Sequence, residues 1–236
     1  MDLIFPQFEG HAGLRYGFSK RSAGSMNRWH EVKNRQDYFR QIGIDPFQTA
    51  TADLVHGNTP LAVDEAAGGQ MISGADALVT DRRGLFLSAT SADCFLIYLF
   101  DPKSLAIGIA HAGWRGALAG LIANTVDLMS TRYGSAAPDI LAGVGPGIRD
   151  CHFEISSFDI IKYQAYPEAI IKRSGKTFID LPLIINRQLL TAGISAGHIT
   201  DSGRCTYCLA DEYFSYRRDK PERVQPMVGY IGVTSR

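Results

Sequence analysis

The sequence predicts an α+β fold with mixed or mainly antiparallel sheets. Short segments rich in β-branched and aromatic residues cluster between helical patterns and do not alternate strictly with them. Several of these segments follow one another closely, which is typical of antiparallel neighbours. No Pro- or Ser-rich linker divides the 236 residues, so we expect one domain over 1–236. An α/β fold is the alternative.

The strands are expected where apolar runs are bounded by Gly, Pro or Asp, and the helices where apolar residues recur at helical spacing. The predicted strands are 76–80, 84–90, 95–100, 105–110, 139–144 and 227–233. The predicted helices are 32–42, 117–131, about 157–165, 183–192 and about 211–217. In the second of these helices, one face carries Leu118, Leu121, Ile122, Val126 and Met129.

The composition argues against a nucleic-acid or membrane partner. Twenty-four basic residues balance twenty-four acidic ones, so no net field favours a polyanion. The longest clean apolar run, FLIYLF at 95–100, is far too short to span a bilayer. The four cysteines form no dense framework, which suits a reducing compartment where thiols stay free or bind metal. We therefore expect a soluble, cytoplasmic protein; its oligomeric state is not predictable.

The hexapeptide HAGWRG at 111–116 lies between a predicted strand and a predicted helix. His111 would stand at the carboxyl end of strand 105–110, where side chains face a crevice. Gly113 and Gly116 permit a tight turn or a close backbone approach. Arg115 offers a planar fork of donors to a carboxylate or phosphate. A plain turn with a packed tryptophan explains the hexapeptide equally well.

Two other stretches place a metal-ligand side chain at the end of an apolar segment. Cys94 lies between two predicted strands in TSADCFLIYL, and His56 follows an apolar pair in DLVHGN. Together with His111 they form a plausible zinc set. Their wide separation is unlike the compact spacing of structural zinc sites, and three ligands leave a fourth position open, as in catalytic sites. Taken singly, Cys94 is as well explained as a small buried residue and His56 as a loop histidine.

A competing pattern begins at His152, in His152-Phe153-Glu154, and ends at the Cys205-x-x-Cys208 pair. It is a loose version of the zinc deaminase signature, but Arg204 stands where that signature has proline. A redox pair would need a thioredoxin-like context that is missing. We therefore expect Cys205 and Cys208 to be packing or local pocket residues. GVGPGI at 143–148 matches no nucleotide-binding loop and is expected to be a turn.

An ordered set of motifs runs across most of the chain: FSKRSAGSMN, VKNR, VHGN, GADALVT, ATSADC, IAHAGWRG, GVGPGI, CHFEI, CTYC and FSYRRD. This set resembles the YfiH family, also called the laccase-domain or FAMIN-like purine nucleoside phosphorylase family. The resemblance implies a layered α/β/β/α fold with two sheets between helices, shared in outline with cytotoxic-necrotising-factor deamidases. It also implies that His56, Cys94 and His111 bind one metal, usually zinc, with copper possible. Leu54 and Phe95 depart from the usual family pattern and bear on substrate preference.

The resemblance implies purine nucleoside chemistry with small-molecule nucleoside and phosphate as substrates. The expected reactions are phosphorolysis of adenosine, inosine, guanosine or methylthioadenosine, and zinc-assisted deamination of adenosine. Cys94 and His111 are candidate catalytic residues, with Asp93 as an acid-base group or as support for a ligand. Arg115 and Arg21 are candidate phosphate-binding residues. For Arg21, in SKRSAG, solvated charge is the simpler explanation.

Three rival functions fit the same residues. Cys94 and His111 could act as thiolate and base in a cysteine hydrolase or deamidase. A copper polyphenol oxidase would need many more histidines than the six present. The third is a non-catalytic nucleotide-binding or peptidoglycan-linked partner protein.

Overall fold

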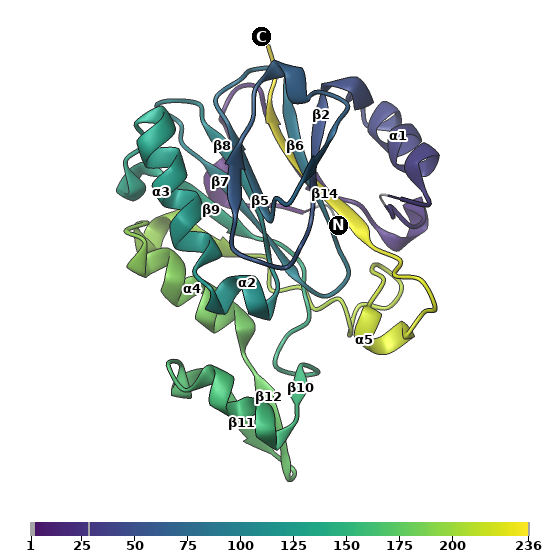
Figure 1. Cartoon of the computed structure of the whole chain (residues 1–236), viewed down its shortest axis with the longest axis vertical. Coiled ribbons are helices and arrows are strands. Elements are labelled where there is room, and N and C mark those ends of the chain that lie inside the picture. Colours follow the sequence, from purple (N-terminus) through teal and green to yellow (C-terminus); the bar gives the residue numbers. More distant parts are fainter. Residues whose placement is uncertain (1–2, 28, 236) are drawn as a thin grey trace.

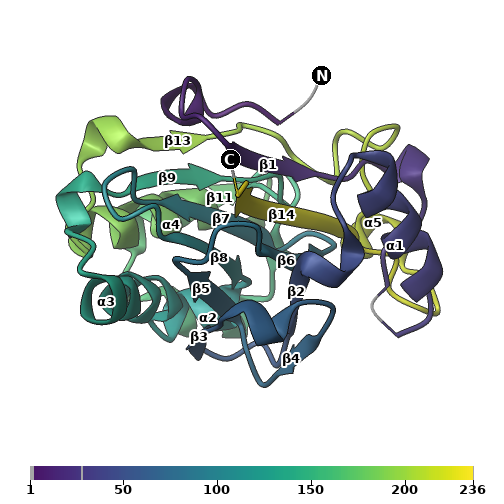
Figure 2. The ribbon, with the colours of Figure 1, turned by 90° about the horizontal axis from the view of Figure 1, so that it is seen from above.

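Residues 3–27 and 29–235 are described by the computed structural model, in which two mixed sheets lie between helices (Figures 1 and 2). The six-stranded sheet has the order β13-β9-β7-β8-β5-β3 and the five-stranded sheet the order β1-β14-β6-β2-β4. Seen from above in Figure 2, α3 lies outside the first sheet and α1 outside the second. This is the layered α/β/β/α arrangement that was predicted.

The bounds of the six-stranded sheet are β13 Ile199–Asp201, β9 Leu141–Val144, β7 Phe95–Phe100, β8 Ile107–Ala112, β5 Ala77–Thr80 and β3 Pro60–Ala62. Those of the five-stranded sheet are β1 Leu14–Phe18, β14 Met227–Val233, β6 Phe86–Ser91, β2 Thr49–Asp53 and β4 Met71–Ser73. The helices are α1 Val32–Gln41, α2 Trp114–Leu118, α3 Leu121–Tyr133, α4 Leu181–Thr191 and α5 Tyr216–Asp219.

Strand β7 shows how one sequence serves two cores. All six of its residues are buried. Phe95, Ile97 and Leu99 pack in the core beneath the helices, whereas Leu96, Tyr98 and Phe100 pack in the core between the sheets. Because side chains alternate across a strand, a continuous apolar run is what a strand buried on both faces requires.

The helix predictions need correction at three places. The predicted helix 117–131 is two helices, α2 and α3, because Gly120 adopts a left-handed conformation with φ of 86° between them. The segment predicted as a helix at 157–165 is a 3-10 helix, Ser157–Tyr163. The helix predicted near 211–217 is shorter and lies later, as α5 over residues 216–219. It begins at Tyr216 because the Ser215 hydroxyl caps it by accepting a hydrogen bond from Arg218 N.

The sequence missed most short strands, including β1 to β4 and β13. It also missed a small antiparallel sheet of β10 Glu154–Ile155, β12 Lys176–Ile179 and β11 Ile170–Arg173. This lobe projects from the layered body at the foot of Figure 1. Within the described part of the chain, the helices are too short or too polar to cross a bilayer.

Candidate metal centre and substrate pocket

His56, Cys94 and His111, the three ligands that the family resemblance implies, converge in the structure. One ligand atom from each lies within 4.8 Å of the other two. The two imidazole rings meet edge to face, with centroids 5.0 Å apart and an interplanar angle of 88°. Two nitrogens and a sulfur at this separation could hold one borderline metal ion and leave a coordination position open.

The three side chains reach this point from different sheets. His56 is in the loop after β2 of the five-stranded sheet, Cys94 is in the turn before β7, and His111 is within β8. The prediction ended the strand at residue 110, but β8 continues through His111, which pairs with Leu96 of β7. His111 is therefore held by the six-stranded sheet itself.

Asp76, a fully buried residue just before β5, supports two of these three side chains. Its carboxylate accepts from the backbone N–H groups of Val55 (3.1 Å), His56 (2.7 Å) and Gly57 (2.8 Å). Its carbonyl oxygen accepts from His111 N at 2.8 Å. His56 adopts φ of 61°, a left-handed conformation that is unfavourable for a side-chain residue and is held here by three hydrogen bonds.

The two glycines of HAGWRG are required by close approaches. A Cβ at Gly113 would lie 2.8 Å from Cys94 Sγ, and a Cβ at Gly116 would lie 2.7 Å from the carbonyl oxygen of Gly57. Without side chains, these positions let the strand-to-helix turn pass beside Cys94 and beside the loop of His56.

A pocket of about 530 Å³ opens over the three candidate ligands. This volume suits a small-molecule ligand. Arg115 is exposed at the pocket, with its guanidinium carbon 4.5 Å from the ring centroid of Trp114. The exposed side chains of Trp29 and Tyr216 provide two more aromatic surfaces. The other lining residues are Asn27, Leu54, Thr90, Ser91, Ala92, Gly113, Val224 and Pro226.

Cys94 is in an environment that keeps a free thiol protonated. Burial raises its pKa to about 12, and the neighbouring Asp93 carboxylate adds to the rise, while Arg115 opposes it. A free thiol with this pKa is a poor nucleophile near neutral pH. The environment thus weakens the cysteine-hydrolase alternative, in which Cys94 needs a thiolate.

Asp93 lies beside Cys94 but is not among the pocket-lining residues. Its Oδ1 accepts from Thr206 Oγ1 at 2.7 Å, and its Oδ2 accepts from Ser215 Oγ at 3.1 Å and Arg217 N at 2.7 Å. Its own φ is 89°. The carboxylate therefore ties the turn that carries Cys94 to two later segments of the chain.

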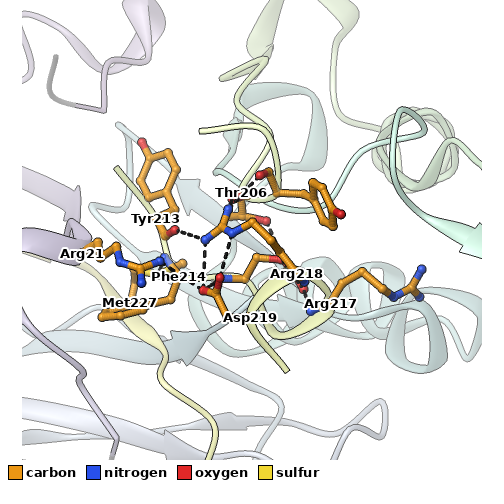
Figure 3. Close-up of polar contacts among 11 residues, drawn as sticks. Arg21, Thr206, Tyr213, Phe214, Arg217, Arg218, Asp219 and Met227 are labelled. Atoms are coloured by element: carbon orange, nitrogen blue, oxygen red, sulfur yellow. Dashed lines mark hydrogen bonds and ion pairs between the residues drawn. The ribbon is translucent and has the colours of Figure 1, made fainter. Parts of the chain in front are cut away.

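Arg21 does not line the pocket over the three candidate ligands. It lies beside α5, where its guanidinium faces Asp219 (Figure 3). Its Nη1 donates to Asp219 Oδ2 at 3.1 Å, and its guanidinium lies 4.7 Å from the ring centroid of Phe214. The Asp219 carboxylate also accepts hydrogen bonds from Arg218, so Arg21 and Arg218 share one carboxylate.

Cys151, His152, Cys205 and Cys208, here termed the three-cysteine cluster, come together at the base of the projecting lobe. One ligand atom from each of the four lies within 4.8 Å of the others. The interpretation of Cys205 and Cys208 as packing residues did not foresee this, because Cys151 is far from both in the sequence. The backbone bridge between Gly147 and Cys205 joins the two segments, and it gives GVGPGI a structural role away from the residues lining the pocket.

Comparisons with known proteins agree with this fold. Residues 18–234 match the family described as multi-copper polyphenol oxidoreductase laccase. The chain is 32% identical to purine nucleoside phosphorylase YlmD of Geobacillus stearothermophilus, over 96% of this chain and 92% of the relative. The solved structure of YlmD from that organism superposes with a TM-score of 0.89 at 28% identity, covering 98% of this chain and 94% of the other.

A second solved structure, the hypothetical protein YfiH of Bacillus licheniformis, has a TM-score of 0.84 and 29% identity, covering 94% and 93% of the two chains. Similarity in sequence and in fold thus extends over nearly the whole chain. The chain belongs to the multi-copper polyphenol oxidoreductase laccase family, the YfiH or laccase-domain family that its motifs resemble.

Proposed function

We propose that this chain is a metal-dependent purine nucleoside enzyme that cleaves nucleosides with phosphate and also deaminates adenosine. The observation that carries the proposal is the convergence of His56, Cys94 and His111 beneath a pocket large enough for a nucleoside. The relatives named purine nucleoside phosphorylase, which include YlmD, supply the substrate class.

Zinc is the metal that fits this donor set best. Two imidazole nitrogens and one thiolate are borderline ligands, and three protein ligands are typical of a catalytic zinc. The absence of a Cβ at Gly113 leaves the space beside Cys94 Sγ that such a set needs. Zinc held there supplies Lewis-acid chemistry and makes hydroxide available near neutral pH.

In phosphorolysis, a phosphate oxygen attacks C1′ of the nucleoside, and the bond from C1′ to the base nitrogen breaks. The base leaves with the bonding electron pair and takes up a proton, so the products are a sugar 1-phosphate and a free purine. Arg115 is exposed at the pocket and is the proposed phosphate anchor, because its planar guanidinium matches two phosphate oxygens. Trp29 and Tyr216 offer aromatic faces to the base.

In deamination, water adds at C6 of adenosine and ammonia leaves, which gives inosine. For this reaction Asp93 is proposed as a positioning residue. Its two carboxylate oxygens already accept three hydrogen bonds from Thr206, Ser215 and Arg217, so proton transfer would require it to give up donors. Its hydrogen bonds hold the turn in which Cys94 stands.

The test is to incubate the purified protein, with its metal content measured, with adenosine and phosphate and to resolve adenine, inosine and hypoxanthine by chromatography. The wild-type protein should give adenine with phosphate, and inosine independently of phosphate. Cys94→Ala should lose the metal bound by His56, Cys94 and His111 and form neither product. A metal-loaded wild-type protein that forms no product would overturn the assignment, and turnover by metal-free protein that alkylation abolishes would instead support a cysteine hydrolase.

The two candidate phosphate-binding arginines can be compared directly. Arg115→Ala should raise KM for phosphate by about tenfold or more, since a bidentate charged contact contributes about 1.5–3 kcal/mol, with the metal content unchanged. Arg21→Ala should leave KM for phosphate near the wild-type value, because Arg21 pairs with Asp219. A larger effect at Arg21 than at Arg115 would reverse the assignment of the phosphate anchor.

A further inference from the structure

The three-cysteine cluster has the donor spacing of a tetrahedral metal site. Cys151 Sγ lies 3.5 Å from both Cys205 Sγ and Cys208 Sγ, and Cys208 Sγ lies 3.3 Å from His152 Nδ1. Ligands placed tetrahedrally around zinc at its usual bond lengths are separated by about 3.5–3.8 Å. These three separations are within a few tenths of an ångström of the spacing that zinc imposes, and the other donor pairs lie within 4.8 Å of one another.

We infer that Cys151, His152, Cys205 and Cys208 form a second zinc site, separate from the pocket and closed by four protein ligands. Three cysteines and one histidine, two of the cysteines in a C-x-x-C pair, are a donor set of structural zinc sites. Three sulfur donors also exclude magnesium and calcium, which take oxygen ligands. With four protein ligands, this zinc has no open position for a substrate.

The donors are held in place from both sides of the cluster. Cys205 belongs to a segment joined to Gly147 by backbone hydrogen bonds, Gly147 N to Arg204 O at 3.2 Å and Thr206 N to Gly147 O at 3.1 Å. The His152 ring stacks on the Tyr207 ring with centroids 3.9 Å apart and planes 13° from parallel. This stacking fixes the imidazole plane, so little ordering remains to be done when a metal binds.

Arg218 fixes the loop that carries the C-x-x-C pair (Figure 3). Its Nη1 donates to the carbonyl oxygens of Thr206 (2.8 Å) and Tyr207 (2.7 Å), and its Nη2 donates to Tyr213 O at 2.8 Å. Its Nε and Nη2 also donate to the Asp219 carboxylate. All five N–H donors of a guanidinium are accounted for in this way, which leaves the loop one well-defined position.

The charge balance around the cluster suits three thiolates. Binding of Zn²⁺ releases three thiol protons to solvent and leaves a net charge of about −1 on the site with a neutral imidazole. Arg173 Nη2 donates to the carbonyl oxygens of Asp150 (3.3 Å) and Cys151 (3.1 Å), and Arg217 Nη1 donates to His152 O at 3.4 Å. Two guanidinium groups therefore lie beside the backbone of the ligands and offset this charge.

The second site would connect the projecting lobe to the catalytic turn. Cys151 and His152 lie just before β10 of the lobe, separated from it by one residue. Cys205 and Cys208 lie on either side of Thr206, whose hydroxyl donates to Asp93 Oδ1. A metal held by all four joins these segments next to the turn of Cys94. Its role is structural, and it is independent of which reaction the pocket catalyses.

Metal counting in matched variants tests the inference. The wild-type protein, expressed with zinc and purified under reducing conditions, should contain about two zinc ions per chain by mass spectrometry of the metals. Cys94→Ala should retain about one, at the three-cysteine cluster. Cys208→Ser should also retain about one, at the pocket, and the double variant should retain almost none. Cys208 is exposed, so this substitution should leave the folded state intact.

X-ray absorption at the zinc edge gives a second readout that does not depend on activity. In Cys94→Ala the zinc environment should contain three sulfurs and one nitrogen, whereas in Cys208→Ser it should be dominated by nitrogen and oxygen. The inference is overturned if Cys94→Ala contains no zinc or shows a sulfur-poor environment, or if mass spectrometry finds a disulfide between two cluster cysteines in reduced, zinc-supplied protein. A wild-type protein that binds two zinc ions but turns over no nucleoside would count against the proposed function and leave the second zinc site supported.

Discussion

Asp76 shows how much a single carboxylate contributes to the geometry of the candidate metal centre. It accepts three backbone N–H groups of the loop that carries His56, and its carbonyl oxygen receives His111 N. No feature of GADALVT marks this residue in the sequence, because the partners of its carboxylate stand some twenty residues earlier in the chain. A buried acid that satisfies backbone donors is visible only once the loop is in place.

Asp76→Asn should therefore weaken metal binding at the pocket by about 10- to 100-fold, the usual effect of losing a group that orients a ligand. The amide nitrogen of Asn would face a backbone N–H, so at least one hydrogen bond is lost. Competition with a chromophoric zinc chelator measures the affinity, with Asp127→Asn on the exposed face of α3 as the matched control. Equal affinities in the two variants would contradict the supporting role of Asp76.

The raised pKa of Cys94 predicts an unusual pH dependence of alkylation in metal-free protein. With a pKa of about 12, the thiolate fraction rises about tenfold per pH unit well beyond the value of about 8.5 at which an ordinary cysteine levels off. Iodoacetamide labelling of the Cys94 peptide, followed by mass spectrometry between pH 7 and 11, should show a rate that is still rising at the upper end. A plateau near pH 9 would indicate an ordinary thiol.

At the scale of the elements, the turn between β8 and α2 requires glycine where the chain passes close to other atoms. Gly116→Ala should lower the free energy of unfolding by about 1–3 kcal/mol, because the new Cβ would meet a backbone oxygen that cannot rotate away. It should also weaken metal binding, since that oxygen belongs to Gly57, next to His56. Urea unfolding and zinc competition measure the two effects.

The control for this substitution is Gly197→Ala, where a Cβ would meet no atom within 4 Å. We expect a change of at most about 0.5 kcal/mol there. Similar losses at the two positions would mean that the general cost of replacing glycine, and not the approach to Gly57, explains the effect.

The success of the element predictions followed the strength of the apolar pattern. β7 and β14 have the predicted bounds, because each is a mostly apolar run whose residues are all buried. β2, with the sequence TATAD, was missed because Thr and Ala are only weakly hydrophobic and form no apolar run, although the strand is buried between β6 and β4. The break at Gly120 was missed because the apolar spacing continues across it.

Individual residues of the candidate site could be predicted from the sequence, but most contacts that bring them together could not. The three ligand candidates were identified from their places at the ends of apolar segments, and the resemblance to a family joined them. Loop closure brought in residues with no local signal, such as Trp29 and Tyr216 at the pocket and Cys151 in the three-cysteine cluster. Such contacts form between distant segments, which periodicity within one segment does not encode.

At the scale of the whole molecule, a buried tyrosine hydroxyl joins the two sheets across their shared core. Tyr98 of β7 is fully buried, and its hydroxyl donates to Gly17 O of β1 at 2.9 Å. Tyr98→Phe should lower the free energy of unfolding by about 1–2 kcal/mol, since it removes one buried hydrogen bond while keeping the ring.

Urea unfolding followed by circular dichroism measures this loss. Tyr216→Phe serves as control, because Tyr216 is exposed, and its stability should stay within about 0.5 kcal/mol of wild type. An unchanged free energy of unfolding in Tyr98→Phe would mean that this hydrogen bond does not contribute to holding the two sheets together.

The order of the five-stranded sheet has a consequence for biosynthesis. β14 lies between β1 and β6, which it pairs in antiparallel fashion on both sides. Because β14 follows both strands in the sequence, β1 and one edge of β6 have no partner strand in the nascent chain until β14 is made. The sheet therefore cannot be completed before residues 227–233 are translated, and until then the backbone N–H and C=O groups along one edge of β6 lack the partners that β14 supplies.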